Sequence, residues 1–303
     1  MKSHLLTLYT RTPLHVGCGT SVDVVDLPIM RERITNFPVI PSTSLKGVLR
    51  QAGRDYAKSD GSVGSAKYTL AVNDVLFGNK DDVQKDADGK EKFHAGCLQI
   101  MEAKLLAFPV RSLAGCFAWL TCPAALRRFQ RDSGKTFTIP DVARDQAIVS
   151  NGSELVVQGQ NMVVLEEYAL NTGNEGHGDV VAGLKDLVAD SLWSDKLAKR
   201  LAILHDEDFQ HFVSTCTEVV ARIAIDPATR TVGGGALFNQ ENVPCEALFY
   251  SVLTVLAPRR NDSAAAPDDS LTALFKANAT LQIGGDETTG HGFCSVHHQT
   301  LNA

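Results

Sequence analysis

The order of hydrophobic and polar positions along the chain predicts alternating strands and helices. Residues 4–10 are largely apolar and lead into a glycine-rich loop, which is typical of a buried strand. Over residues 42–57 the apolar side chains recur at helical spacing directly after Pro41, so we predict an amphipathic helix there. The apolar face of that helix comprises Leu45, Val48, Leu49, Ala52 and Tyr56.

The same pattern continues towards the C-terminus. Two β-rich stretches, residues 97–109 and 115–121, are expected to be neighbouring strands of one sheet. Apolar positions between Leu184 and Trp193 suggest a helix inside an acidic block. The later elements are predicted as strands over 217–226, 246–256 and 281–283, a hairpin over 227–245 and a helix over 268–277. This order of elements predicts an α+β fold with large insertions.

The composition and the cysteine spacing exclude several classes of protein. Its 303 residues hold 29 Lys and Arg against 35 Asp and Glu, a net charge of −6, with 44% hydrophobic residues, which is typical of a folded domain. No apolar run approaches the roughly 18–20 residues of a membrane span, and no secretory signal is visible at the N-terminus. The seven cysteines include no Cys-x-x-Cys pair, so we expect reduced thiols in a cytoplasmic protein without membrane partners.

The net negative charge of the whole chain argues against a nucleic-acid partner, but the charges are unevenly distributed along the sequence. Residues 27–54 hold five cations against one anion, and residues 104–135 hold six against one. Lys46, Arg50 and Arg54 share one side of the predicted helix, because they are four residues apart. Two basic segments fit a groove that contacts phosphates. A solvated helix face and a chance cluster explain the same spacing.

Few motifs of common enzymes are present. Gly134-Lys135-Thr136 resembles the end of a phosphate-binding loop, but Phe129 stands where that motif requires glycine. The zinc-protease, hydrolase and dinucleotide motifs are also missing from the sequence. Residues 284–292 are rich in glycine, and such a loop brings backbone N–H groups close to phosphate oxygens or is simply a flexible turn.

Several segments together carry a family resemblance. They include Val25-Asp26-Leu27-Pro28-Ile29, Ile40-Pro41-Ser-Thr-Ser-Leu45-Lys46-Gly47, Phe117-Ala-Trp-Leu-Thr-Cys-Pro123 and the glycine loop at 284–292. In this order they resemble the RAMP superfamily of CRISPR proteins, and more narrowly the RNA-cleaving backbone subunit of type III-B (Cmr) effector complexes. The likeness extends from about residue 5 to residue 296.

This resemblance implies a single domain over 1–303, built on an RRM-like (ferredoxin-like) palm with finger and thumb elements inserted. The implied insertions are a catalytic loop at about 17–39, finger or helical insertions at 59–95 and 140–215, and a thumb β-hairpin at 227–245. Copies of the chain are expected to form a helical filament along one CRISPR RNA, together with other type III-B subunits. Each copy is expected to cut complementary target RNA near a kink that its thumb introduces.

The resemblance also implies roles for individual residues. Asp26 is the implied catalytic residue and ligand of a divalent metal ion, Mg²⁺ or Mn²⁺, for attack of an RNA 2′-hydroxyl on the adjacent phosphorus. His15 is a candidate for proton transfer or RNA contact, and a strand-end histidine without such a role is the alternative. The implied RNA contacts are Lys46, Arg50, Arg54, Gly284, Gly285, Gly290, His291 and Gly292, and the thumb residues are Arg230, Thr231, Val232, Leu237 and Phe238.

Two other functions are compatible with the sequence. The first is a scaffold of the same fold that binds the guide without cutting, which would not require Asp26. The second is a metabolic enzyme that binds a small phosphorylated molecule at residues 284–292. Co-purification of short RNA would distinguish the second from an RNA-binding subunit.

Overall fold

The molecule is organised around one large, mostly antiparallel sheet. The computed structural model describes residues 2–21, 24–59, 62–63, 66–79, 84–85, 91–226, 228–259 and 266–301. The strands of the central path, in spatial order, are β11 (Met162–Leu165), β12 (Tyr168–Gly173), β10 (Gln146–Ile148), β13 (Leu201–Leu204), β9 (Phe117–Thr121), β8 (Ala103–Arg111), β16 (Leu248–Val255), β1 (Lys2–Thr10), β18 (Phe293–Leu301) and β17 (Thr280–Gln282). β2 (Val39–Ile40) pairs with β8, and β7 (Leu98–Ile100) pairs with β16. Only two of the described pairs, β10–β12 and β9–β13, are parallel.

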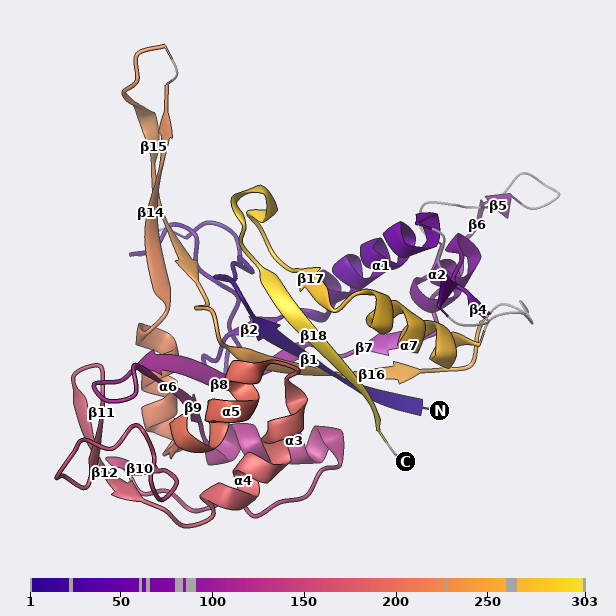
Figure 1. The fold of residues 1–303 in the computed structure, drawn as a ribbon. Helices are drawn as coiled ribbons and strands as arrows, with labels where there is room; N and C mark the ends of the chain where they lie inside the picture. Colours follow the sequence, from indigo (N-terminus) through magenta and orange to yellow (C-terminus); the bar gives the residue numbers. More distant parts are fainter. Residues whose placement is uncertain are drawn as a thin grey trace.

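Helices cover both faces of this sheet. One group, α1 (Ser42–Lys58), α2 (Leu70–Phe77) and α7 (Pro267–Ala277), lies together above the central strands in Figure 1. The other group is α3 (Pro123–Ser133), α4 (His177–Leu184) and α5 (Ser191–Arg200), with the 3₁₀ turn η1 (Lys185–Leu187) between α4 and α5. The helix α6 (Asp206–Thr215) places Phe209, Phe212 and Val213 in the same hydrophobic cluster as α1, α2 and α7. A second 3₁₀ turn, η2 (Glu287–Thr289), lies in the glycine loop.

The sheet is apolar on both faces because helices cover both. Successive side chains of β1 point to opposite faces. Leu6 and Leu8 join the hydrophobic cluster that contains α1, α2 and α7, whereas Leu5 and Tyr9 join a second cluster that contains α3, α4 and α5. This explains why residues 4–10 are an almost continuous buried run instead of an alternating one.

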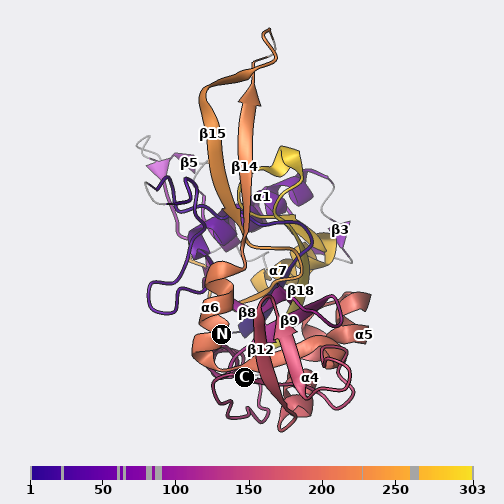
Figure 2. The ribbon, with the colours of Figure 1, turned by 90° about the vertical axis from the view of Figure 1, so that its left-hand side faces the viewer.

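A two-stranded hairpin projects from this body. It consists of β14 (Glu218–Ile225) and β15 (Val232–Asn242), which pair only with each other as strands and extend away from the main sheet (Figures 1 and 2). The predicted strand over 217–226 is therefore one arm of the hairpin, and the hairpin expected over 227–245 begins earlier than predicted. Pro227 at its turn lies outside the described residues.

Most of the long elements match the sequence prediction. The strands over 4–10 and 246–256 and the helices over 42–57 and 268–277 are confirmed as β1, β16, α1 and α7. The single helix expected between Leu184 and Trp193 is wrong. The backbone becomes extended at Val188, which ends the first helical segment, and the Asp190 side chain caps the next helix by accepting from the Leu192 N–H at 2.8 Å.

Two expected insertions contain regular structure. Residues 140–215 add β10–β13 to the main sheet. Residues 59–95 contain α2 and four short strands, β3 (Ser62–Val63), β4 (Ala66–Lys67), β5 (Gln84–Lys85) and β6 (Glu91–Lys92). In the part of the chain that is described, no helix has the length and apolar character needed to cross a bilayer.

Candidate functional site

The base of the hairpin carries the candidate functional site. One edge of β15 is bound by two segments from the N-terminal loop. Leu27 donates to the Asn239 carbonyl at 3.0 Å, and its own carbonyl accepts from the Glu241 N–H at 3.0 Å. Further along the same edge, Leu14 and Val243 exchange two backbone hydrogen bonds, at 2.8 and 2.9 Å. The loop after β1 is thereby fixed to the hairpin at two points.

Asp26 is bound to that edge by its side chain. Its Oδ2 accepts a hydrogen bond from the backbone N–H of Asn239 at 2.8 Å, and its backbone carbonyl accepts from the Ser21 N–H at 2.9 Å. The residue is exposed, and Oδ1 has no hydrogen-bond partner among the described residues. The carboxylate is therefore held at one oxygen and open at the other. Asp23, nearby in the sequence, lies outside the described residues.

His15 is bound to the same edge. Its Nδ1 lies 2.7 Å from the carbonyl oxygen of Glu241. Because a carbonyl only accepts, Nδ1 carries the proton, and Nε2 of the neutral ring is left as a proton acceptor. A Cβ on Gly17 would lie 2.7 Å from Nε2, so the glycine leaves the space beside this nitrogen open. The role of His15 as a base or as an RNA contact stays a prediction, with Nε2 as the nitrogen available for either.

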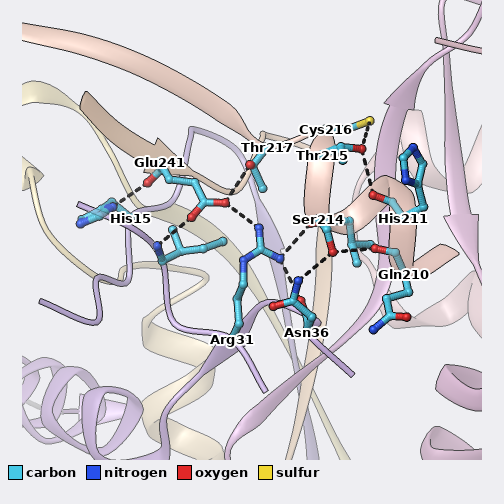
Figure 3. Close-up of polar contacts among 12 residues, drawn as sticks. His15, Arg31, Asn36, Gln210, His211, Ser214, Thr215, Cys216, Thr217 and Glu241 are labelled. Carbon is cyan, nitrogen blue, oxygen red and sulfur yellow. Dashed lines mark hydrogen bonds and ion pairs between the residues drawn. The ribbon is translucent and has the colours of Figure 1, made fainter. Parts of the chain in front are cut away.

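Glu241 connects these segments, and the sequence analysis did not identify it (Figure 3). Its buried carboxylate accepts from Arg31 Nη2 at 2.5 Å, from the Ile29 N–H at 3.0 Å and from Thr217 Oγ1 at 2.8 Å. Arg31 in turn donates to the carbonyls of Asn36 and Val213, at 2.8 and 3.0 Å. One buried anion thus joins the loop that carries Asp26, the end of α6 and the hairpin.

The glycine loop at 284–292 packs against His15. The Gly285 N–H donates to the His15 carbonyl at 2.9 Å. The N–H groups of Gly290, His291 and Gly292 also bond within the protein, to the carbonyls of Glu287, Asp286 and Pro13. These four predicted phosphate contacts therefore already have backbone acceptors. This weakens the case for a small-molecule phosphate site and leaves RNA contact here as a prediction.

The predicted basic face of α1 is only partly directed to solvent. The sequence predicts that Lys46, Arg50 and Arg54 share one side of this helix, but Arg50 is turned to the protein: its Nη2 donates to the Phe77 carbonyl at 2.8 Å and so caps the end of α2. Lys46 and Arg54 are partly exposed on the same helix. Partial burial, followed by repulsion from Arg50, lowers the pKa of Lys46. Lys46 is thus better placed for a guide contact than Arg50.

Most cations of the second basic segment have carboxylate partners, either Asp132 of the same segment or residues from other parts of the chain. Lys104 pairs with Asp132 at 2.7 Å, and Arg128 Nη1 donates to Glu32 Oε2 at 2.9 Å. Burial alone would raise the pKa of Glu32, but hydrogen bonds from Arg128 and Thr35 lower it overall. Three further arginines of this segment, Arg111, Arg127 and Arg131, have carboxylate partners at 2.9–3.5 Å. Lys104 and Arg128, at 10% and 22% exposed, are held in their ion pairs, whereas Arg111, Arg127 and Arg131 are 59–72% exposed and remain candidates for phosphate contact.

The thumb residues occupy the outer part of the hairpin. Arg230 and Thr231 are exposed at its turn, and Arg230 has a φ of 55°. Leu237 is 64% exposed, with Ile223 opposite it on β14 at 52%. Phe238 is half-buried, and Val232 pairs with Ile225 through its backbone. Apolar side chains exposed on a projecting ribbon are typical of a surface that contacts another molecule.

Among the described residues of this site, Asp26 is the candidate ligand for a divalent ion. Among the described residues no group of three or more His, Cys, Asp or Glu side chains could hold a metal ion. Mg²⁺ is often bound by only one or two carboxylates together with substrate phosphates. The open Oδ1 of Asp26 fits that arrangement, in which RNA supplies the remaining ligands.

Comparison with known proteins identifies the family of the chain. The family model of the RAMP superfamily matches residues 7–295. The chain is 41% identical over 308 residues to the CRISPR system Cmr endoribonuclease Cmr4 of Pyrococcus furiosus, covering 98% of this chain and 95% of the relative. It is 25% identical to the CMR subunit Cmr4 of Saccharolobus solfataricus, covering 94% and 92%.

Solved structures give the same result. The crystal structure of oligomeric Cmr4 from Pyrococcus furiosus matches with a TM-score of 0.71 at 33% identity, covering 100% of both chains. A chain in the type III-B Cmr-beta complex bound to cognate target RNA shares the fold, with a TM-score of 0.71 at 18% identity. The chain belongs to the RAMP superfamily. Within that superfamily it is a homologue of Cmr4.

Proposed function

We propose that this chain is a guide-binding backbone subunit of a type III-B complex and that it cleaves target RNA paired with the guide. The observation that carries the proposal is the position of Asp26 and His15 on one edge of β15, at the base of the projecting hairpin. The relative at 41% identity is named an endoribonuclease, and a similar crystal structure is described as oligomeric. Copies of this chain are therefore proposed to form a filament along one CRISPR RNA.

The palm of this subunit is proposed to be RRM-like. The chain order β1, α1, β8, β16, α7, β18 corresponds to the spatial order β8-β16-β1-β18, with every pair antiparallel. The two helices of this unit pack in one hydrophobic cluster on the same face of the sheet. A βαββαβ unit with this order is ferredoxin-like in topology. The finger and thumb elements are additions to it.

The proposed reaction is attack of a target-RNA 2′-hydroxyl on the adjacent phosphorus. His15 Nε2 accepts the 2′-hydroxyl proton, the new O2′–P bond forms, and the P–O5′ bond breaks, with water protonating the leaving oxygen. A divalent ion at Asp26 Oδ1, when bound, would offset the charge that develops on the phosphate. The hairpin would supply the splayed nucleotide geometry that in-line attack requires.

The alternative within the same family is a scaffold that binds the guide without cutting. The exposed carboxylate of Asp26, open at Oδ1, favours cleavage, since a scaffold has no need of it. The free state of all seven cysteines is compatible with a protein that works in the cytoplasm.

The test compares assembled complexes that carry wild type or Asp26→Asn, with complementary RNA and Mg²⁺ or Mn²⁺. Asparagine retains an oxygen that accepts from the Asn239 N–H, so the loop should keep its position. We expect target binding to persist and cleavage to fall by a factor on the order of 10² or more. Asp141→Asn, at a fully exposed carboxylate, is the matched control and should cut normally. Normal cleavage by Asp26→Asn would refute the catalytic assignment.

A further inference from the structure

Asp286 connects the glycine loop to the hairpin. Its Oδ2 accepts from Gln240 Nε2 at 2.6 Å and pairs with Arg222 Nη2 at 3.1 Å. The two donors come from the two strands, since Arg222 lies in β14 and Gln240 in β15. The carboxylate of this glycine loop is thus directed at the hairpin.

The hairpin presents these donors on one face. Val220 is opposite Gln240 in the register, and Arg222 is two residues further along β14, so the side chains of Arg222 and Gln240 share a face. Gln240 is 2% exposed, and the Arg222 side chain is 21% exposed. Arg222 Nη2 also lies 3.3 Å from His291 Nε2, which accepts from it. Among the described residues, Asp286 is the only carboxylate paired with Arg222.

The hairpin is therefore attached to the body in two directions. Its β15 edge is hydrogen-bonded to the loop that carries Asp26, and its face is bound to the glycine loop through Asp286. A two-stranded ribbon held along one edge alone can rotate about that edge. The ion pair on its face opposes such a rotation. Asp286 has a φ of 63°, a conformation that asparagine tolerates as well as aspartate.

We infer that Asp286 is a positioning residue that fixes the angle of the hairpin relative to the palm. Through that angle it determines where the hairpin meets the guide–target duplex, and hence where and how fast the target is cut. This inference rests on the proposed function. It concerns the contacts of Asp286 with Arg222 and Gln240, not a contact of Asp286 with RNA.

The experiment uses assembled complexes with end-labelled complementary RNA and compares Asp286→Asn with Glu287→Gln. Glu287 is the adjacent exposed carboxylate, and no contact of its side chain with the hairpin is present among the described residues. Glu287→Gln therefore removes one negative charge from the same loop, as Asp286→Asn does, without breaking a contact with the hairpin. We expect Asp286→Asn to slow cleavage by a factor on the order of 10 to 100 and to broaden the product lengths. Glu287→Gln should leave both unchanged. Unchanged rates and lengths with Asp286→Asn would overturn the inference.

A second variant and a second measurement keep the test decisive. Arg222→Gln breaks the same ion pair from the hairpin side, so it should broaden the product lengths as Asp286→Asn does. The double variant Asp286→Asn/Arg222→Gln should show no further broadening. In the isolated protein, hydrogen exchange over 218–225 should accelerate in Asp286→Asn and not in Glu287→Gln, and equal exchange in both would contradict the inference. If wild type does not cut, or Asp26→Asn cuts normally, the proposed function fails. If wild type cuts, Asp26→Asn does not, and Asp286→Asn cuts like wild type, then this inference fails and the proposed function stands.

Discussion

Asp26 and His15 are bound to backbone groups two residues apart on the same edge of β15. The Asp26 carboxylate accepts from the N–H of Asn239, and the His15 imidazole donates to the carbonyl of Glu241. Two residues of extended strand span about 7 Å, so the two side chains approach the hairpin base at neighbouring positions. A single strand therefore sets the spacing of a carboxylate and an imidazole from two different parts of the loop.

His15→Gln should slow cleavage without preventing target binding. Glutamine can still donate to the Glu241 carbonyl, but it has no basic nitrogen in the place of Nε2. We expect the rate of single-turnover cleavage in the assembled complex to fall by about 10²-fold. The dissociation constant for a complementary RNA, measured on the same complex, serves as the control. A wild-type cleavage rate would show that His15 has no role in proton transfer.

Glu241→Gln should destabilise the whole site. The Arg31 and Glu241 side chains are 16% and 9% exposed, so the substitution leaves a largely buried guanidinium without its anion. Loss of one partner from a buried pair costs about 3–5 kcal/mol, and the free energy of unfolding, from urea titration, should fall by an amount of that order. The double variant Arg31→Gln/Glu241→Gln should lose less than the two single variants added together. Full additivity would contradict direct coupling.

The glycines of the 284–292 loop should differ in their tolerance of alanine. At Gly284 a Cβ would lie 2.1 Å from the His15 carbonyl oxygen, and at Gly292 it would lie 2.0 Å from that of Ile283. Gly290 has a similar φ of +86° but nothing within 4 Å of its Cβ position. Gly290→Ala should therefore cost only about 1–2 kcal/mol for the left-handed backbone, and the other two variants clearly more. Thermal unfolding of the three purified variants measures the order.

A buried histidine pair should make stability depend on pH. Burial, followed by repulsion from His4 and His297, lowers the pKa of His298 to about 4, and His298 Nε2 lies 2.9 Å from His4 Nδ1. Between pH 6.5 and 4 the unfolded chain binds a proton at this residue and the folded chain does not. The free energy of unfolding should therefore fall on acidification, by up to about 1.4 kcal/mol per pH unit from this group.

The matched variant for this pH effect is His298→Gln. Glutamine can still form a hydrogen bond with His4 Nδ1, as donor or acceptor, but it does not titrate in this range. Urea unfolding of both proteins at pH 7, 6 and 5 should show a smaller slope for the variant. Equal slopes would assign the acid sensitivity to other groups.

The sequence by itself determined the elements whose information is local. The apolar spacing around Leu45 and Leu49 predicted α1, and the continuous apolar run over 4–10 predicted β1, because period and burial are properties of neighbouring residues. The segment around Asp26 pointed to the family, and the comparisons bear that out. β18 (Phe293–Leu301) was not predicted, since His297, His298 and Gln299 interrupt its apolar pattern.

Only the tertiary structure decided how these pieces form a site. Glu241 stands in a polar run that gives no local signal, yet it binds Arg31, 210 residues away in the sequence. Residues 104–135 give a second example. Arg128 is paired with Glu32, 96 residues away in the sequence, so a charge that looks free in the sequence is paired in the fold. Charge and hydrogen-bonding capacity are written in the sequence, but which groups satisfy each other depends on the topology that brings distant segments together.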